Sequence, residues 1–359
     1  MKILQIAPIY IPITLDMGYG GIERVVLSLA RIFDEKGHDV ITAAPADSRP
    51  CGKLLPTLRQ SEWAKPKMEA DPNAYEEHVS KIIDYVTDND LDVIHDHTGN
   101  FVLSNTFNKR SRESIKLKKI PIIVTPHELK RFKKSPLPKQ ENIFFTALSN
   151  YQSSVFSDFV DVKRVINNGI FVGEYPFTNK KKGYLFSLGS IERDKGQDLA
   201  VRVALETGLP LKIGGNIAEQ DFYDLEIKDH SGQIEYVGEL NDDEKKEFYK
   251  NAEAFIVPIR IGDCFSLTRI ESLACGTPVI TLDTGSAREA VKHGETGYLV
   301  KYNPSDDGKM VKRMAQYVRN LNAIDPNECR SDVDKRFNMN MISDKYIKLY
   351  KDIISGKLS

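Results

Sequence analysis

The sequence predicts an α/β protein with two Rossmann-like, doubly wound domains that face one another across a cleft. Short apolar runs alternate with segments of helical period, which is typical of a parallel sheet covered by helices on both faces. This pattern restarts after a polar stretch near the middle of the chain. The length of 359 residues also favours two domains, each large enough to bury its own core.

The first half contains the elements of one such domain, expected over residues 1–170. Apolar residues at helical spacing, closed by Gly37, predict a helix over 21–36. A second helix is expected to about residue 87, with Asp71 as N-cap and Pro72 as first helical residue. Short apolar runs predict strands at 3–7, 40–43, 93–95, 120–124, 143–147 and 165–166.

The second domain is expected over 171–340, after the turn Asn167-Asn168-Gly169 and the polar run TNKKKG. Its predicted strands are 184–188, 211–213, 234–237, 255–257, 279–281 and 298–300, with helical segments between them. A last helical stretch covers about 341–354. In folds of this kind the carboxyl ends of the strands bind the ligands, so we expect the cleft to contain the site.

Composition excludes several function classes. The chain is 41% hydrophobic and 28% charged with a formal net charge of −1, which indicates a soluble globular protein and gives no case for nucleic-acid binding. The four cysteines are widely separated and suggest neither disulfides nor a zinc ribbon, as expected of a cytoplasmic protein. The apolar start lacks a cleavage site, and no run approaches the roughly 18 apolar residues that span a bilayer.

The segment IGDCFSLTRIESLACGTPVI carries the strongest chemical signal. It places two carboxylates, Asp263 and Glu271, with seven residues between them and before a Gly-Thr-Pro turn. If a helix begins near Ser266, its free N–H groups lie beside Asp263 and form a site for an anion. A nucleotide sugar offers both a diphosphate anion and hydroxyls for carboxylates to bind. Taken alone, however, the pair is better explained by a capping Asp and a Glu on a solvated helix face.

Two further features suit a phosphate-bearing ligand. The loop Gly18-Tyr19-Gly20-Gly21 precedes a helix, where glycines allow a backbone to approach phosphate closely; a simple flexible turn is the alternative. In GSIERDKGQ, Lys195 follows a buried strand, where its charge can neutralise a departing diphosphate; most lysines in such places are only solvated.

Histidines and aspartates raise the question of a metal. His95 and His97 have a spacing seen in metal sites, but the further ligands are missing, and a hydrogen-bonded core role is expected for His95. Asp-x-Asp pairs occur at residues 88–92 and 332–334, and we interpret them as solvated caps. We therefore predict no metal requirement.

Ten segments, in their order along the chain, together resemble the GT-B glycosyltransferases of family 4, also called glycosyl transferases group 1. These are retaining enzymes that use nucleotide-sugar donors. The resemblance covers nearly the whole chain, and the segments are YGGIERVVLSLARIFDEKGHDV, DVIHDHTGN, IIVTPHE, VINNGI, YLFSLGSIERDKGQDLAVRVA, LPLKIGG, IEYVGEL, IGDCFSLTRIESL, ACGTPVI and GETGYLV.

The resemblance implies roles for individual residues. His97, Lys195, Asp263 and Glu271 would be catalytic, with Asp263 on the transferred hexose and Glu271 on the nucleotide ribose. His97 and His127 would border the acceptor. The donor, most often a UDP- or GDP-sugar, would be a cosubstrate and no cofactor is implied. The donor-binding residues would be Gly20, Gly21, Gly189, Ser190, Arg193, Lys195, Gly215, Gly238, Glu239, Asp263, Phe265, Ser266, Leu267 and Glu271.

The chain departs from the family pattern at two positions. Ser190 stands where the family has Arg, and Asp263 stands where it usually has Glu. Arg193 is our candidate to replace the missing cation. The resemblance also implies that the C-terminal helix, residues 341–359, packs back onto the first domain.

The acceptor is expected to be a carbohydrate or a lipid-linked molecule, in cell-surface polysaccharide, glycolipid or related glycoconjugate synthesis. A run of basic residues in the first domain would fit peripheral contact with the inner face of an anionic membrane, although such runs are usually only solvated. Two alternatives stay open: different chemistry on a GT-B fold, such as epimerisation, and a binding protein with reduced turnover. The basic residues are Lys109, Arg110, Arg112, Lys116, Lys118, Lys119, Lys130, Arg131, Lys133 and Lys134.

Overall fold

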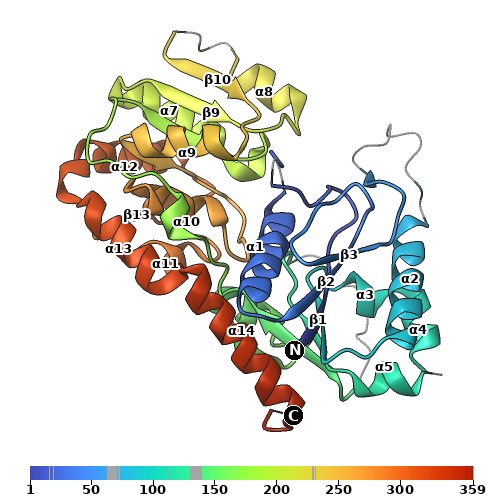
Figure 1. Ribbon diagram of the computed structural model, residues 1–359. Coiled ribbons are helices and arrows are strands. Elements are labelled where there is room, and N and C mark those ends of the chain that lie inside the picture. The colour runs from blue at the N-terminus through green and yellow to red at the C-terminus, as the bar shows by residue number, and fades with distance from the viewer. Residues whose placement is uncertain are drawn as a thin grey trace. The chain divides into compact units, whose positions relative to one another are not determined.

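The computed structural model describes the chain except residues 16, 19, 63–70, 72, 113, 130–139, 229, 231 and 359. It divides into two compact units, each built around its own parallel sheet (Figure 1). The first unit comprises Met1–Asn168 together with Met339–Ser359, and the second comprises Gly169–Asn338. The predicted class of two Rossmann-like α/β domains is confirmed.

The first unit has a seven-stranded sheet in the order β3-β2-β1-β4-β5-β6-β7. All neighbouring strands are parallel, and the apolar runs of the central strands are buried. Its strands are β1 (Lys2–Ile6), β2 (Asp39–Ala44), β3 (Lys53–Pro56), β4 (Val93–Asp96), β5 (Ile122–Val124), β6 (Ile143–Ala147) and β7 (Val162–Val165).

Helices cover this sheet because each presents one apolar face. In α1, for example, Val25, Val26, Leu29 and Phe33 are buried at helical spacing. The helices of the unit are α1 (Gly21–Glu35), α2 (Ala74–Asp88), α3 (Asn100–Leu103), α4 (Asn105–Arg110), α5 (Ile115–Lys119), α6 (Asn150–Phe156) and α14 (Met339–Ile354).

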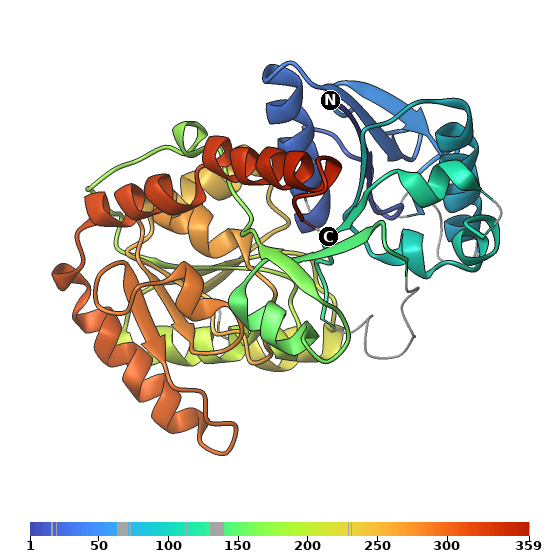
Figure 2. The ribbon, with the colours of Figure 1, turned by 90° about the horizontal axis from the view of Figure 1, so that it is seen from below.

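The last helix, α14, belongs to the first unit although nearly the whole second unit precedes it in the sequence. It lies beside α1 in both views (Figures 1 and 2). Tyr346 and Tyr350 of α14 are buried in this unit, and the Tyr350 hydroxyl is 2.7 Å from His95 Nδ1 on β4. The C-terminal helix therefore completes the core of the N-terminal unit.

The second unit has a six-stranded parallel sheet in the order β10-β9-β8-β11-β12-β13. Its strands are β8 (Leu185–Leu188), β9 (Leu211–Gly214), β10 (Ile234–Gly238), β11 (Ala254–Ile256), β12 (Val279–Leu282) and β13 (Gly297–Val300). Its helices are α7 (Gln197–Thr207), α8 (Gln220–Glu226), α9 (Asp242–Asn251), α10 (Leu267–Ala274), α11 (Ala287–Ala290), α12 (Asp307–Arg319) and α13 (Pro326–Phe337), with short 3₁₀ turns at Val172–Glu174, Arg193–Lys195 and Leu321–Ala323.

Both strand orders reverse direction at a defined point. The chain first builds outward from β1 or β8 on one side and then continues with β4 or β11 on the other. Ligands of doubly wound folds bind at this switch point, outside the carboxyl ends of the strands. The segments at the switch point are therefore those that follow β8 and β11 in the second unit, and those that follow β1 and β4 in the first unit.

Two local expectations are wrong. The strand β3 was not expected, because it is short, lies at the sheet edge and is largely accessible. The helix α2 begins at Ala74 with Asn73 as N-cap, so Asp71 does not cap it. Asp71 Oδ1 instead accepts from the Asn73 amide at 2.8 Å, a local turn that competes with helix initiation. Pro72 lies outside the described residues.

Candidate functional site

The predicted helix near Ser266 is confirmed as α10, which starts at Leu267 with Ser266 as N-cap. No described side chain caps its first turn, because the Ser266 hydroxyl bonds to Thr268 Oγ1 at 2.8 Å instead. Ser266 and Leu267 are only partly buried, whereas Phe265 packs against Phe337 with ring centroids 5.2 Å apart. The helix N-terminus thus keeps amide donors and partial positive charge available for an anion.

Asp263 lies in the loop that leads into α10, and its carboxylate is already bound by protein donors. Arg269 Nη1 donates to Oδ1 at 3.1 Å and to Oδ2 at 2.8 Å. Ser286 donates its amide and its hydroxyl to Oδ1 at 3.2 and 2.7 Å. The loop also lies against Gly285, where an added Cβ would be 2.3 Å from the Asp263 amide nitrogen. Oδ2 therefore retains most of the remaining acceptor capacity.

Glu271, on the second turn of α10, is buried in a cage of donors. Lys245 Nζ lies 2.7 Å from Oε1, and the Tyr175 hydroxyl donates to the same oxygen at 3.2 Å. Tyr249 donates to Oε2 over a longer 3.4 Å. A carboxylate can accept about four hydrogen bonds, so Oε2 keeps room for a further donor. This burial rules out the alternative explanation of a Glu on a solvated helix face.

Glycines end three adjacent strands of the second sheet. The Gly189 amide donates to the Gly214 carbonyl at 3.1 Å, and the Gly215 amide donates to the Gly238 carbonyl at 2.8 Å. A Cβ on Gly215 would be 2.0 Å from the Gly189 carbonyl oxygen, and its φ of +131° also favours glycine. These backbones can approach one another only without side chains. Glu239, next to Gly238, is exposed.

Ser190 follows Gly189 and is buried, with its hydroxyl donating to Asn216 Oδ1 at 3.1 Å. Its carbonyl accepts from Gln197 Nε2 at 2.7 Å, which ties the loop to the start of α7. A serine here therefore stabilises the loop and supplies no cation at the position where the family pattern has one.

The cations of the Arg193–Lys195 turn have different environments. Lys195 Nζ lies 3.9 Å from Glu192 Oε1, and its side chain is 33% exposed. The Arg193 side chain is 60% exposed; it lies 3.7 Å from Glu219 and over the Phe222 ring. The structure thus places Lys195 in a weak surface pair, while Arg193 lies against the start of α8.

Arg260, which sequence reasoning missed, fixes this turn to the end of β11. It donates to the Arg193 carbonyl at 2.9 Å and forms a bidentate pair with Asp198 at 2.7 and 2.6 Å. Hydrogen bonds to Asp198 raise the Arg260 pKa above its ordinary value. The turn after β8 and the loop after β11, which contains Asp263, are therefore held side by side at the switch point.

In the first unit, the glycine loop precedes α1 as predicted. Gly20 is the N-cap of α1 with φ of +131°, and Gly21 is its first residue. The neighbouring Glu23 was not expected to matter, yet its carboxylate is buried beside the loop: a Cβ on Gly20 would be 3.0 Å from Glu23 Oε2. Burial raises the pKa of Glu23 to about 7, and the charge of Glu128 adds to this rise.

His95 and His97 stack with ring centroids 3.9 Å apart at the end of β4. The core role expected for His95 is confirmed, since it is buried between Thr125 and Tyr350 at 2.7 Å each. His97 Nε2 lies 3.1 Å from Gln5 Oε1, which leaves Nδ1 buried without a partner among the described residues. Burial lowers the pKa of His97 well below its ordinary value, so the ring is neutral.

His127 lies near His97, with ring centroids 5.8 Å apart. The residue is only partly buried, but its Nε2 is shielded from solvent and has no partner among the described residues. Burial lowers the pKa of His127, so it is neutral as well. The two rings therefore offer unprotonated nitrogens, which accept hydrogen bonds from hydroxyl groups.

Some side chains of the basic run, which was considered for contact with an anionic membrane, are already engaged in ion pairs. Arg110 pairs with Asp84, and Lys116 pairs with Asp90. Arg112 and Lys118 line a hollow of about 510 Å³, together with Asn108, Ser111, Gln140, Glu141 and Asn142. Lys130, Arg131, Lys133 and Lys134 lie outside the described residues.

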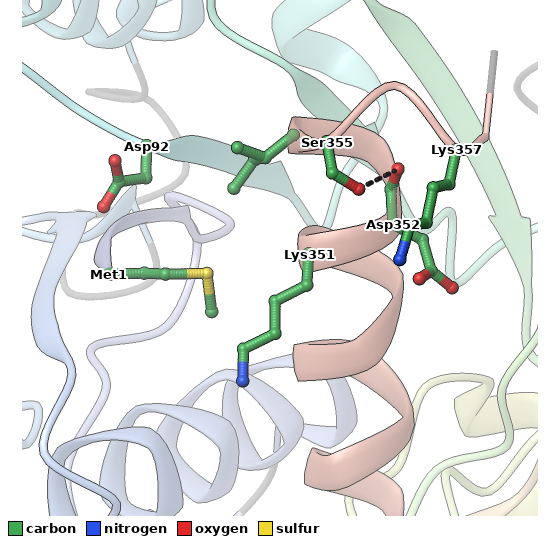
Figure 3. Close-up of a pocket in the computed structure, with 7 residues that line it drawn as sticks. Met1, Asp92, Lys351, Asp352, Ser355 and Lys357 are labelled. Atoms are coloured by element: carbon green, nitrogen blue, oxygen red, sulfur yellow. Dashed lines mark hydrogen bonds between the residues drawn. The ribbon is translucent and has the colours of Figure 1, made fainter.

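Two other hollows lie away from the predicted site residues. One of about 460 Å³ is bounded by Met1 and Asp92 on one side and the end of α14, with Lys351 and Lys357, on the other (Figure 3). The other, of about 810 Å³, lies between α12 and the segment after β13, and Lys301, Lys309, Lys312 and Arg313 are among its lining residues.

Within the described part of the chain, no three His, Cys, Asp or Glu residues are grouped as metal ligands would be. The expectation of solvated caps at 332–334 is wrong: both aspartates lie inside α13, and Asp332 is buried and pairs with Lys292 and Arg336. The described helices include none with the length and apolar character needed to cross a bilayer. All four cysteines are free.

The structure thus brings Asp263, Ser266, Leu267 and Glu271 together around one helix N-terminus. Two Rossmann-like domains, each with a parallel sheet, are the architecture of the GT-B fold. Sucrose-phosphate synthase from Thermosynechococcus elongatus shares the fold, with a TM-score of 0.77 at 18% identity over 99% of this chain and 100% of that one. Anabaena HepE in complex with UDP and glucose also shares it, with a TM-score of 0.73 at 14% identity over 98% and 99%.

Sequence comparison gives the family. Residues 19–170 match the model of Glycosyltransferase Family 4, and residues 175–331 match that of Glycosyl transferases group 1. A phosphatidyl-myo-inositol mannosyltransferase from Mycolicibacterium smegmatis is 23% identical over 322 residues, 80% of this chain and 78% of that protein. The chain belongs to the family 4, group 1 glycosyltransferases, as the sequence resemblance predicted.

Proposed function

We propose that this glycosyltransferase moves a hexose from a nucleotide sugar to an acceptor hydroxyl, with retention of anomeric configuration and without a metal ion or cofactor. The uncapped N-terminus of α10, flanked by Asp263 and Glu271, is the observation that carries the proposal. It combines amide donors for a diphosphate with carboxylate oxygens for sugar hydroxyls.

In this proposal the donor diphosphate lies at the α10 N-terminus, near the amides of Phe265, Ser266 and Leu267. Asp263 Oδ2 accepts a hydroxyl of the hexose, and Glu271 Oε2 accepts a hydroxyl of the ribose, because these oxygens have the fewest protein donors. Gly189, Gly215 and Gly238 line the strand ends, where backbone and ligand can approach closely.

The chemical step depends on stabilising the leaving group. As the anomeric bond loosens, negative charge builds on the diphosphate, and Lys195 and the α10 amides stabilise that charge. The acceptor hydroxyl attacks from the face that the diphosphate leaves, and the leaving phosphate takes the hydroxyl proton, so no carboxylate nucleophile is needed. Arg193 serves as the second cation in place of the family's Arg. A side chain that is 60% exposed can reorient toward a bound diphosphate.

The first unit is proposed to bind the acceptor. His97 Nδ1 and His127 Nε2 are neutral, shielded from solvent and without described partners, so they can accept hydrogen bonds from an acceptor hydroxyl. The acceptor is placed among glycolipids and cell-surface polysaccharides, and a glycolipid agrees with the similarity to a phosphatidyl-myo-inositol mannosyltransferase. A UDP-sugar donor agrees with the complex of HepE with UDP and glucose.

The direct test is a donor screen followed by product analysis. Thermal shift against UDP-, GDP- and ADP-sugars identifies the donor, and transfer is then assayed with an acceptor panel in the presence of a chelator. We expect transfer to persist in chelator and the product to keep the donor's anomeric configuration. Inversion, or activity restored only by manganese, would overturn the mechanism. Lys195→Ala and Arg193→Ala are both expected to lower kcat; full activity in Arg193→Ala would remove Arg193 from the mechanism.

One observation favours a second candidate, a nucleotide-sugar-binding protein with reduced turnover. Asp263 is already neutralised by Arg269 and bound by Ser286, and Ser190 supplies no cation. Donor binding without transfer or hydrolysis across the acceptor panel would support this candidate. Product analysis with donor alone distinguishes a third outcome, epimerisation, because an epimerase needs no acceptor.

A further inference from the structure

Asp263 and Glu271, the two carboxylates of the proposed donor site, are each paired with a cation that the sequence analysis did not single out. Glu271 pairs with Lys245 of α9, and Asp263 pairs with Arg269 of α10 itself. Both cations are buried: the side chain of Lys245 is 6% exposed and that of Arg269 is 0% exposed. Lysine and arginine normally keep their charged ends in water, so two of them buried at one site require an explanation.

Lys245 is committed to this cluster. Its Nζ lies 2.7 Å from Glu271 Oε1 and 3.1 Å from Asp242 Oδ1, while Lys246 also pairs with Asp242. The four formal charges of Asp242, Lys245, Lys246 and Glu271 cancel. A buried ion pair contributes little net stability compared with apolar residues of similar volume, so stability alone does not explain a charged cluster at this position.

Arg269 uses one nitrogen for its hydrogen bonds to the described part of the chain. Nη1 reaches both oxygens of Asp263 and, at 3.4 Å, the Ser286 hydroxyl. Nε and Nη2 are buried and have no hydrogen-bond partner among the described residues. A guanidinium that leaves two nitrogens unsatisfied is a poor structural anchor. Its one engaged nitrogen holds the carboxylate that precedes the α10 N-terminus.

The proposed ligand explains why such neutralisation is useful. Two unpaired carboxylates beside a diphosphate would repel it. A cation bound to each carboxylate cancels its charge and fixes the direction of the oxygen that remains free to accept a hydrogen bond.

We propose that Lys245 and Arg269 are positioning residues of the donor site, which hold Glu271 and Asp263 oriented and charge-compensated for a nucleotide sugar. This inference rests on the proposed function. Neither cation touches the substrate; each acts through the carboxylate it binds. Tyr175 and Tyr249 complete the orientation of Glu271.

The test compares a nucleotide with and without ribose hydroxyls, because a merely structural role would not change the difference between the two. In Lys245→Met, Glu271 loses the cation that binds its Oε1, so the carboxylate is less well oriented to accept a ribose hydroxyl. Binding of a nucleoside diphosphate and of its 2′,3′-dideoxy analogue to the full chain is measured by calorimetry at one pH.

We expect wild type to bind the nucleotide at least about tenfold more tightly than its dideoxy analogue, and Lys245→Met to lose most of this difference. Lys245→Arg keeps the charge and should follow wild type. The matched control is Lys250→Met on the same helix, where the lysine pairs with Glu247 and is more exposed. Its preference for the nucleotide over the dideoxy analogue should stay that of wild type. If Lys245→Met does not fold, Lys245→Gln, which also lacks the charge, replaces it.

Arg269 gives a second, independent readout. Because only Nη1 is engaged, Arg269→Lys should retain nucleotide affinity within about threefold, whereas Arg269→Met should lose about tenfold or more. Wild-type-like nucleotide binding in Arg269→Met, together with a wild-type-like preference over the dideoxy analogue in Lys245→Met, would overturn the inference while leaving the proposed function intact. If wild type binds none of UDP, GDP and ADP, the proposed function and this inference fail together.

Discussion

Glu23 provides the sharpest test of the electrostatics in the first unit. Its carboxyl group is buried in the first turn of α1, and burial is the main cause that raises its pKa from 4.5 to about 7. The nearby charge of Glu128 raises it further, while its own backbone amide and Arg24 oppose the rise. Glu23→Gln keeps the size and the carbonyl acceptor but cannot ionise. The substitution therefore isolates the cost of burying the charge.

The sign and size follow from proton linkage. Between pH 4.5 and about 7 the folded protein holds the Glu23 proton more tightly than the unfolded chain does, so stability falls as pH rises through this window. Above about pH 7 the folded protein bears the full cost of burying the ionised Glu23 carboxylate. A pKa raised from 4.5 to about 7 corresponds to ~3 kcal/mol, an upper figure for the gain in Glu23→Gln near neutral pH and above.

Thermal unfolding of wild type and variant at two pH values measures this gain. At about 2–4 °C per kcal/mol, Glu23→Gln should raise the Tm of the first unit by up to ~10 °C at about pH 8, and by little at about pH 4.5. Glu35→Gln, an exposed position on the same helix, is the control and should change Tm by only a degree or two. Equal Tm shifts for Glu23→Gln at both pH values would refute the reasoning.

Three other predictions concern backbone, core and thiols. Gly215→Ala should lower Tm and abolish nucleotide binding, because its Cβ would be 2.0 Å from a backbone carbonyl. Tyr350→Phe should lower the free energy of unfolding in urea by about 1–3 kcal/mol, because buried His95 Nδ1 loses its partner at 2.7 Å. Iodoacetamide at about pH 8 should label Cys51 in the native protein but not buried Cys275, whose pKa burial raises to about 12.

Each of these predictions has a control or a contradicting result. Gly208→Ala also replaces a glycine with positive φ but meets open space, so it should cost only about 1 kcal/mol and leave nucleotide binding unchanged. Unchanged stability in Tyr350→Phe would mean that the hydroxyl does not hold α14 in the first unit. Equal labelling rates for native and unfolded Cys275 would contradict its burial.

Much of the fold could be predicted because its signals are local. Apolar runs and helical periodicity depend on neighbouring residues, and they located the central strands and α1. The helix start supposed near Ser266 was also located correctly, although the Ser266 side chain makes no capping bond. The local signal failed at Asp71, where a turn with Asn73 competes with the cap, and at β3, which has little apolar surface to mark it.

The sequence by itself determined the family, the two-domain α/β class and the segment that contains Asp263 and Glu271. Only the tertiary structure decided what those carboxylates bind. Lys245 lies on a different helix, 26 residues before Glu271, and Ser286 lies 23 residues after Asp263, beyond a strand. No periodicity links such residues, because they meet only when helices and loops pack on the same sheet, and burial then makes each charge require a partner.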